Sequence, residues 1–307
     1  MIKPAKLKNE KTEQYSPIKD GIRHLLRHRS GQAGLIILAI LVLMAIFADV
    51  ISPYDPTALL KEKRRQTPCI HILGCPADQP EHIFGTDGNS RDLFSRVVFG
   101  SRLSLQVGVA TMTFAIIIGV LIGAIAGFVG GWLDNLLMRL MDVLMAFPSL
   151  LLAIAIVSVL GIGLINALLA IGIVSIPRFA RLVRSTVLSV RELEYVQAAK
   201  ALGASPMHIL FKRILPNAVT PLIVQGTLGI ATAILDSAAL SFLGLGAEPP
   251  RPEWGLMLSE ERNSIFSAPH LVFFPGIFIM LTVLGFNLLG DGLRDSLDPR
   301  LSRSANQ

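Results

Sequence analysis

Long stretches without a charged residue constrain this chain more than any other feature of its sequence. Residues 103–133 form 31 consecutive uncharged positions, and residues 143–177 form another 35. A helix needs about 20 apolar residues to cross the hydrocarbon core of a bilayer, which is roughly 30 Å thick. Charged residues make up 16% of the chain, whereas soluble domains average about 25%. We therefore predict an all-α, polytopic membrane protein. The composition excludes a soluble enzyme, a nucleic-acid-binding protein and a disordered scaffold.

Six transmembrane helices are predicted from the uncharged stretches. The first is interpreted as a retained anchor and not as a cleavable signal peptide, because Ile46 lies where a cleavage site needs a small residue. The predicted spans are 30–50, 103–133, 137–160, 164–181, 214–235 and 271–290.

The third and fourth spans come from the single uncharged stretch at 143–177. As one helix it would be about 52 Å long, too long for one crossing. The turn Gly161-Ile162-Gly163 lies near its middle and predicts a hairpin of two helices. Pro148 and Pro177 are expected to kink these helices, because neighbouring helices can bond the freed backbone groups.

A row of glycines marks one face of the second span. Gly119, Gly123 and Gly127 recur at every fourth position. Small residues at this spacing let two helix backbones approach closely in lipid. We predict close packing against another span; the alternative is that glycine is simply common in membrane helices.

The basic residues indicate orientation. With the N-terminus in the cytoplasm, nineteen of the 28 lysines and arginines lie on the inner side, as the positive-inside rule requires. This orientation gives a basic cytoplasmic arm (1–29), an extracytoplasmic loop (51–102), a membrane core (103–290) that includes a cytoplasmic loop at about 182–217, and a cytoplasmic tail (291–307). The outer loop is long enough for a small soluble subdomain.

Two groups of residues are expected near the membrane surface. Arg178, Arg181 and Arg184 recur at every third position where the fourth span leaves the membrane. We expect them to touch lipid headgroups, with contact to a partner protein or to the inner loop as the alternative. Trp254, close to the outer end of the fifth span, is expected to anchor at the interface.

The cytoplasmic loop begins with helical signals of its own. Leu193, Val196 and Ala199 follow helical spacing, and Gly203 is expected to end this first helix. Ala198 and Ala199 keep one side of it thin.

A second short helix is predicted directly after the glycine. Ser205 and Pro206 form an N-cap and first-turn pair. Pro216 is expected to end this helix, and Asn217 to cap the next span. Two short helices joined at a glycine would form a compact knob suited to docking into another protein.

This loop resembles the signature of bacterial ATP-binding cassette (ABC) importer permeases: Glu-Ala-Ala, three residues, Gly, nine residues, Ile-x-Leu-Pro. Gln197 replaces the glutamate, and Arg213 occupies the first isoleucine position. The peptide-importer branch often moves the acid to the position of Glu194. The residues that fall in register are Ala198, Ala199, Gly203, Leu215 and Pro216. The resemblance implies that these residues, with Glu194 and Gln197, form the coupling element gripped by an ATPase subunit.

Three further stretches resemble the dipeptide and oligopeptide subgroup of these permeases, specifically the second of its two paired subunits. They are 84–96 before the second span, 234–255 at the outer end of the fifth span, and 286–299 at the end of the chain. Ser90 stands where the subgroup usually has glycine. The resemblance extends from about residue 21 to 300.

The resemblance implies the type I ABC importer permease fold in a bacterial plasma membrane. It also implies a paired permease subunit, two ATPase subunits, an extracytoplasmic solute-binding protein and a di- or oligopeptide substrate. The chain has no phosphate-binding GxxxxGK loop and no HExxH motif. We therefore expect no catalysis and no cofactor on this chain, with ATP and Mg used by the partner ATPases.

Asp236 is the one carboxylate predicted to lie near lipid depth, in the outer part of the fifth span. Intramembrane acids are costly and usually face a partner or a water-filled path. Asp236 is therefore a candidate for the translocation path, where it would meet the ammonium group of a peptide. A hydrogen bond between helices is the alternative.

Cys69 and Cys75 are the only cysteines, and both lie in the predicted outer loop. An oxidising exterior favours a local disulfide between them. Free thiols are one alternative. A metal site with His71 is another, although two thiols and one imidazole fall short of a closed four-ligand site.

Two rival functions are consistent with a six-span chain. A secondary transporter or channel usually has buried ionisable relays and matched broken helices, whereas this sequence has one acid at lipid depth and no obvious repeat. An ABC importer for nickel, glutathione or another solute would keep the same architecture, because permease motifs follow architecture more closely than substrate.

Overall fold

The computed structural model of this protein describes residues 25–26, 28–61, 64–76 and 78–297. Most of the predicted arm at 1–29, and the predicted tail beyond 297, lie outside these residues. The described part is helical, with two isolated bridges in the outer loop, Cys69 with His82 and Thr86 with Asp92. Its α-helices are α2 (Arg29–Ile46), α3 (Ala48–Ile51), α4 (Leu93–Val129), α5 (Gly131–Met145), α6 (Ser149–Leu160), α7 (Leu164–Arg191), α8 (Glu194–Ala201), α9 (Pro206–Ile209), α10 (Val219–Phe242), α11 (Trp254–Glu261) and α12 (His270–Leu297).

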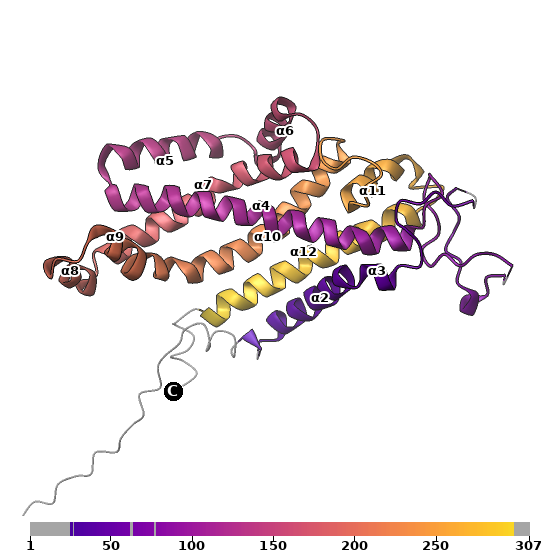
Figure 1. The fold of residues 1–307 in the computed structure, drawn as a ribbon, viewed down its shortest axis with the longest axis horizontal. Coiled ribbons are helices and arrows are strands. Elements are labelled where there is room, and N and C mark those ends of the chain that lie inside the picture. The colour runs from indigo at the N-terminus through magenta and orange to yellow at the C-terminus, as the bar shows by residue number, and fades with distance from the viewer. Residues whose placement is uncertain (1–24, 27, 62–63, 77, 298–307) are drawn as a thin grey trace, which may run out of the picture.

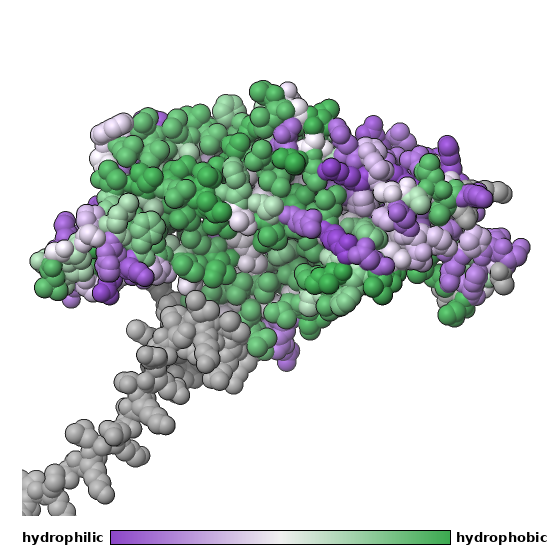
Figure 2. All heavy atoms as spheres, viewed as in Figure 1, coloured by the Kyte–Doolittle hydropathy of each residue, from purple (hydrophilic) through white to green (hydrophobic). Residues whose placement is uncertain are grey.

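Five helical segments in the described ranges are long and apolar enough to cross a membrane: α2, α4, α7, the run from Pro206 to Phe242, and α12. The pair α5 and α6 makes a sixth if it is counted as one broken span. Figure 2 shows apolar side chains over the middle of the molecule and polar ones toward the two ends. This distribution fits a bundle whose middle lies in lipid.

The long helices α4 and α7 lie side by side at the centre of the fold (Figure 1). A Cβ atom added at Gly119, Gly123 or Gly127 would collide with Phe179, Ala180 or Val187 of α7 respectively. The glycine row therefore brings the two backbones together, which confirms the predicted close packing.

The two ends of the described chain meet on one side of the bundle. α2 packs along α12, and Gly34 of α2 lies against the backbone of α12 at Gly285 and Leu289. His28 Nε2 lies 3.5 Å from a carboxylate oxygen of Asp295. In Figure 1, the start of α2, the end of α12 and the α8–α9 segment lie at the same end of the molecule, with the outer loop at the other end.

The predicted third span, 137–160, is wrong as a single helix. α5 and α6 are separate helices bent by 96° at the break between them. Pro148 lies in this break and is the N-cap of α6. Proline lacks the N–H of a continuous helix and disfavours the α conformation in the residue before it. The expected kink is therefore a complete break, whereas α7 continues as one helix through Pro177.

The second span also begins earlier than predicted, at Leu93 instead of residue 103. Asp92 caps the helix, since its Oδ2 accepts a hydrogen bond from the Ser95 N–H at 2.8 Å. Arg96 and Arg102 lie within α4 because other segments supply carboxylates for them, Glu260 and Asp49, at 3.1 and 2.8 Å. The uncharged stretch of sequence begins after Arg102, but the helix begins before both arginines, because their charges are paired.

Trp254 does not anchor at the membrane interface, contrary to the prediction. It begins α11, is fully buried, and its indole Nε1 donates a hydrogen bond to the Val97 carbonyl at 3.0 Å. Gly100 allows the close approach, because a Cβ there would collide with the indole. α11 therefore packs against α4 and α10, and its indole has no free face that could reach the membrane interface.

Candidate coupling site

α8 and α9 form the compact knob that the loop sequence predicted. Gly203 has φ of +81°, in the left-handed region. The Gly203 N–H bonds the Lys200 carbonyl at 3.0 Å, and the Ala204 N–H bonds the Ala199 carbonyl at 3.1 Å. This is the Schellman pattern that ends helices. Ser205 then caps α9, with Pro206 in its first turn. Both predicted boundaries are confirmed.

The inner face of the knob is tied to α7. Val196 of α8 and Ile209 of α9 are buried in a cluster with Val183 and Val187 of α7. Gln197 Nε2 also donates a hydrogen bond to the Arg191 carbonyl at 2.9 Å. The knob is thus packed on the end of α7 and is not a loosely tethered loop.

The outer face of the knob carries apolar side chains without cover from the described chain. Leu202 is 88% exposed, Met207 66% and Phe211 56%. In Figure 1 the α8–α9 segment that carries them lies at the same end of the molecule as the start of α2 and the end of α12. Exposed apolar groups gathered on a polar surface are typical of a protein interaction site.

The residues of the predicted coupling signature lie at or beside this face. Glu194 begins α8, and Gln197, Ala198 and Gly203 are exposed. Ala199 is half-buried. Leu215 and Pro216 lie farther along the chain, at the base of α10. The fold therefore brings the first five together on the knob and places the last two at its junction with the bundle.

Pro216 does not end the helix before it, contrary to the prediction. The chain stays helical from Pro206 to Phe242, through a π turn (Leu210–Ile214) and a 3-10 turn (Leu215–Ala218). Both turns change the bonding pattern, so the ladder can pass a proline. Asn217 does not cap α10 either: its Nδ2 donates to the Arg213 carbonyl at 2.8 Å.

Asp236 lies on α10 and is half-buried. No hydrogen bond or ion pair joins it to another residue in the described ranges. Its neighbours on either side differ, since Leu235 is exposed and Ser237 buried. The carboxylate is thus at the edge of the packed surface of α10.

The arginine row is not a free headgroup-facing surface. Arg184 makes two bonds to Asp134 of α5, at 2.5 and 2.6 Å. Arg181 bonds Asp142 of the same helix at 2.5 Å. Sequence reasoning missed Asp134 as a partner. The available signal was that Asp134 and Asp142 lie at the inner end of the third predicted span, and Arg181 and Arg184 at the inner end of the fourth. Unpaired charges beside apolar helices are costly, so the two groups could have been paired.

A buried charge network fixes the outer loop to α11. Asp87 Oδ2 lies 2.6 Å from Arg91 Nε, and Arg91 Nη2 lies 2.8 Å from Glu260. Arg96 reaches the same Glu260 carboxylate at 3.1 Å. Three of these residues belong to the motif at 84–96, but sequence reasoning did not identify Glu260 as their partner. The motif thus has a structural role in closing the outer end of the bundle.

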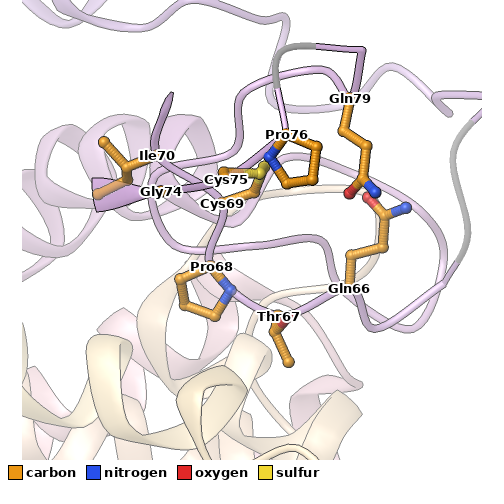
Figure 3. Close-up of a pocket in the computed structure, with 9 residues that line it drawn as sticks. All are labelled: Gln66, Thr67, Pro68, Cys69, Ile70, Gly74, Cys75, Pro76 and Gln79. Carbon is orange, nitrogen blue, oxygen red and sulfur yellow. A yellow bond between two sulfur atoms is a disulfide. The ribbon is translucent and has the colours of Figure 1, made fainter. Parts of the chain in front are cut away.

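The outer loop also holds both cysteines. Cys69 and Cys75 form a disulfide, with Cα atoms 5.4 Å apart. Figure 3 shows the disulfide beside a pocket of about 470 Å³, across which Gln66 and Gln79 face each other. His71 bonds the Gln79 carbonyl through Nε2 at 2.8 Å. The loop that forms this pocket lies at the end of the molecule opposite the knob (Figure 1).

Comparison with known proteins identifies two families in this chain. The family "binding-protein-dependent transport system inner membrane component" matches residues 119–303. The N-terminal transmembrane domain of oligopeptide transport permease C matches residues 16–68.

Curated relatives match almost the whole chain. The dipeptide transport system permease protein DppC of Alkalihalophilus pseudofirmus is 51% identical over 93% of this chain and 91% of its own length. The di/tripeptide transport system permease protein DppC of Pseudomonas aeruginosa is 44% identical over 94% of both chains. The glutathione transport system permease protein GsiD of Escherichia coli is 46% identical over 91% of this chain and 89% of its own length.

Among solved structures, the chain is similar to one from the MetNI methionine ABC transporter in an inward-facing conformation. The TM-score is 0.53 at 20% identity, covering 66% of this chain and 96% of the other. The shared architecture is that of a type I ABC importer permease, as the sequence predicted.

Proposed function

The chain belongs to the family of binding-protein-dependent transport system inner membrane components, and from this membership we propose that it is a permease subunit of an ATP-driven importer of dipeptides and oligopeptides. The observation that carries the substrate class is the 51% identity to a dipeptide permease over 93% of the chain. The long apolar helices place it in a membrane, and they would form half of the translocation pathway.

The partners of the proposed importer follow from the family and from the apolar surface that this chain exposes. A permease of this family works with ATPase subunits and a solute-binding protein, and we propose two ATPases and one paired permease. The apolar outer face of the knob, with Leu202 and Phe211, would dock into an ATPase groove. ATP and Mg would bind to the ATPase subunits, so this chain would neither hydrolyse ATP nor hold a cofactor.

Coupling requires two global states of the pathway that nucleotide binding favours differently. When the ATPases close on ATP, the knob would move with them. Its buried face would pass that motion to α7, because Val196 and Ile209 pack against Val183 and Val187. The residues from Glu194 to Gly203 are the proposed contact with the ATPase, and Leu215 and Pro216 the proposed link to α10.

The orientation of the proposed importer has the knob and both chain ends in the cytoplasm of a bacterium. This arrangement agrees with the excess of basic residues on that side. The loop with the Cys69–Cys75 disulfide would then face the oxidising exterior, where the solute-binding protein delivers peptide.

Asp236 is the proposed substrate-facing carboxylate of the pathway. It is half-buried on α10 and unpaired within the described chain. Asp236→Asn should weaken uptake of free-amine peptides and leave uptake of N-acetylated peptides and assembly of the complex unchanged. Normal uptake of free-amine peptides by the variant would exclude this role.

Reconstitution tests the function as a whole. The chain is co-expressed with its paired permease, ATPases and binding protein, and the complex is placed in proteoliposomes. We expect accumulation of radiolabelled dipeptide that requires both ATP and binding protein. Uptake without ATPase subunits would indicate a secondary transporter and would overturn the proposal.

Glutathione is a second candidate substrate, favoured by the 46% identity to a glutathione permease. Titration of the cognate binding protein with dipeptides and with glutathione distinguishes the two. Tight binding of glutathione alone would change the cargo and leave the importer architecture unaffected.

A further inference from the structure

The arginine row on α7 makes a second set of connections that the proposed function does not use. The Arg184 guanidinium holds both carboxylate oxygens of Asp134, at 2.5 and 2.6 Å. The Arg181 guanidinium holds Asp142 at 2.5 Å. Both carboxylates belong to α5, so α5 is pinned to α7 at two levels along its length.

Burial separates the two pairs in strength. The Asp134 side chain is 12% exposed and that of Arg184 33%, whereas Arg181 and Asp142 are 44% and 55% exposed. A bidentate guanidinium–carboxylate pair is both strong and fixed in geometry. Leaving either charge unpaired among apolar helices is costly. The exposed pair adds little, so the Arg184–Asp134 pair is the main clamp.

Contacts beyond the two ion pairs extend the clamp to α6. Farther along α7, Arg191 Nη1 donates to the Gly127 carbonyl of α4 at 3.0 Å, which fixes the end of α4 from which α5 continues. Beyond the 96° break, Val157 of α6 is buried in a cluster with Ala167 and Ala170 of α7. The broken pair α5–α6 is therefore attached to α7 on both sides of the break, by the two ion pairs of α5 before it and by the packing of α6 after it.

We propose that Arg184, assisted by Arg181, is a positioning residue that makes the broken pair α5–α6 move with α7 as one body during transport. Only Glu192 and Leu193 separate α7 from α8, so a displacement of the knob enters α7 directly. The clamp then carries it to α5–α6. This inference rests on the proposed function, because only there does an ATPase move the knob.

A distance measurement tests the shared motion directly. Leu136→Cys on α5 and Ser185→Cys on α7, both exposed, are spin-labelled in a Cys69→Ser/Cys75→Ser background within the assembled complex. Electron–electron resonance compares the nucleotide-free state with the ATP-bound state of a hydrolysis-deficient ATPase. We expect the same narrow distance in both states. A distance that changes with nucleotide while the clamp is intact overturns the proposal, whatever the variants do.

Charge exchange tests the residues. Arg184→Gln should broaden that distance and lower peptide taken up per ATP hydrolysed about tenfold, a typical size for a coupling effect. Asp134→Arg combined with Arg184→Asp should restore both. Arg139→Gln is the matched control, because Arg139 is an exposed arginine of α5 without an ion pair in the described ranges.

The failure modes are distinguishable. Absence of uptake by the wild-type complex refutes the proposed function. If the wild-type complex imports peptide, but the Arg184→Gln complex keeps both the narrow distance and the wild-type uptake per ATP, the clamp is refuted. An exchange variant that assembles but restores neither measurement also refutes it.

Discussion

Glu253 is one buried carboxyl group whose titration should make the stability of this protein depend on pH. Burial raises the pKa of Glu253 above its ordinary value of 4.5, although its hydrogen bond from the Leu256 N–H acts in the opposite direction. The folded state then holds a proton that the unfolded state has lost. Stability contributed at this site is therefore present below the unfolded pKa and falls as pH rises above it.

Glu253→Gln keeps an oxygen acceptor for the Leu256 N–H and removes the titration. We expect the melting temperature of the wild-type protein in detergent to fall as the pH rises above the ordinary carboxyl pKa of 4.5, and that of the variant to fall less. Glu248→Gln, at an exposed position, is the control and should follow the wild type. Parallel curves for wild type and Glu253→Gln would contradict the assignment.

Gly123 tests the close approach of α4 and α7 with one added methyl group. A Cβ there would collide with the Ala180 carbonyl, and such overpacking typically costs about 1–3 kcal/mol. Gly276 is also helical, but a Cβ there meets nothing within 4 Å. We expect Gly123→Ala to lower the melting temperature and Gly276→Ala to leave it equal or slightly higher. Equal effects of the two substitutions would mean that the glycine row does not set helix spacing.

Single residues were predictable from sequence where their own chemistry determines the outcome. Gly203 ends a helix and Ser205 caps one because each acts on its immediate neighbours. The prediction that Trp254 anchors at the membrane interface was wrong, because its environment is built by Val97 and Gly100, more than 150 positions away in the sequence. Asp134 was missed for the same reason, since its arginine partner comes from another helix.

At the scale of elements, the α8–α9 knob depends on the left-handed turn at Gly203. A β-branched residue pays about 1–2 kcal/mol for this conformation, whereas asparagine adopts it more readily. Gly203→Val should therefore lower both binding-protein-stimulated ATP hydrolysis and peptide uptake, and Gly203→Asn should recover part of each. Steady-state phosphate release and uptake are measured on the same proteoliposomes. A Gly203→Val complex with wild-type values of both would show that the turn is not needed for coupling.

Element types followed from the sequence more reliably than element ends. Hydrophobic length predicted helices at every span, because lipid leaves the backbone no alternative. It could not predict that α4 starts at Leu93, since the charge of Arg96 is neutralised by Glu260 from α11. It also could not separate a kink from the 96° break at Pro148, which depends on how α6 packs against α7.

At the scale of the whole molecule, the arrangement of the ends favours one topology. The start of α2, the end of α12 and the knob lie together, and the disulfide-bonded loop lies at the opposite end (Figure 1). Basic-residue counts predicted the same division of the chain, although the outer loop carries several lysines and arginines. Some of these, Arg91 and Arg96, are buried in ion pairs, so they do not act as free positive charges at a membrane surface.

Labelling from the two sides of the membrane tests this topology. Leu202→Cys places a thiol on the knob and Leu59→Cys places one in the outer loop, at positions 88% and 73% exposed. Both are made in a Cys69→Ser/Cys75→Ser background to remove other thiols. With a membrane-impermeant maleimide, Leu59→Cys should react in intact cells and Leu202→Cys only in inverted vesicles.

Because an ATPase would cover the knob, labelling of Leu202→Cys should also rise when the ATPase subunits are omitted, whereas labelling of Leu59→Cys should not change. Reaction of Leu202→Cys in intact cells would reverse the topology, and with it the assignment of the knob to the ATPase side.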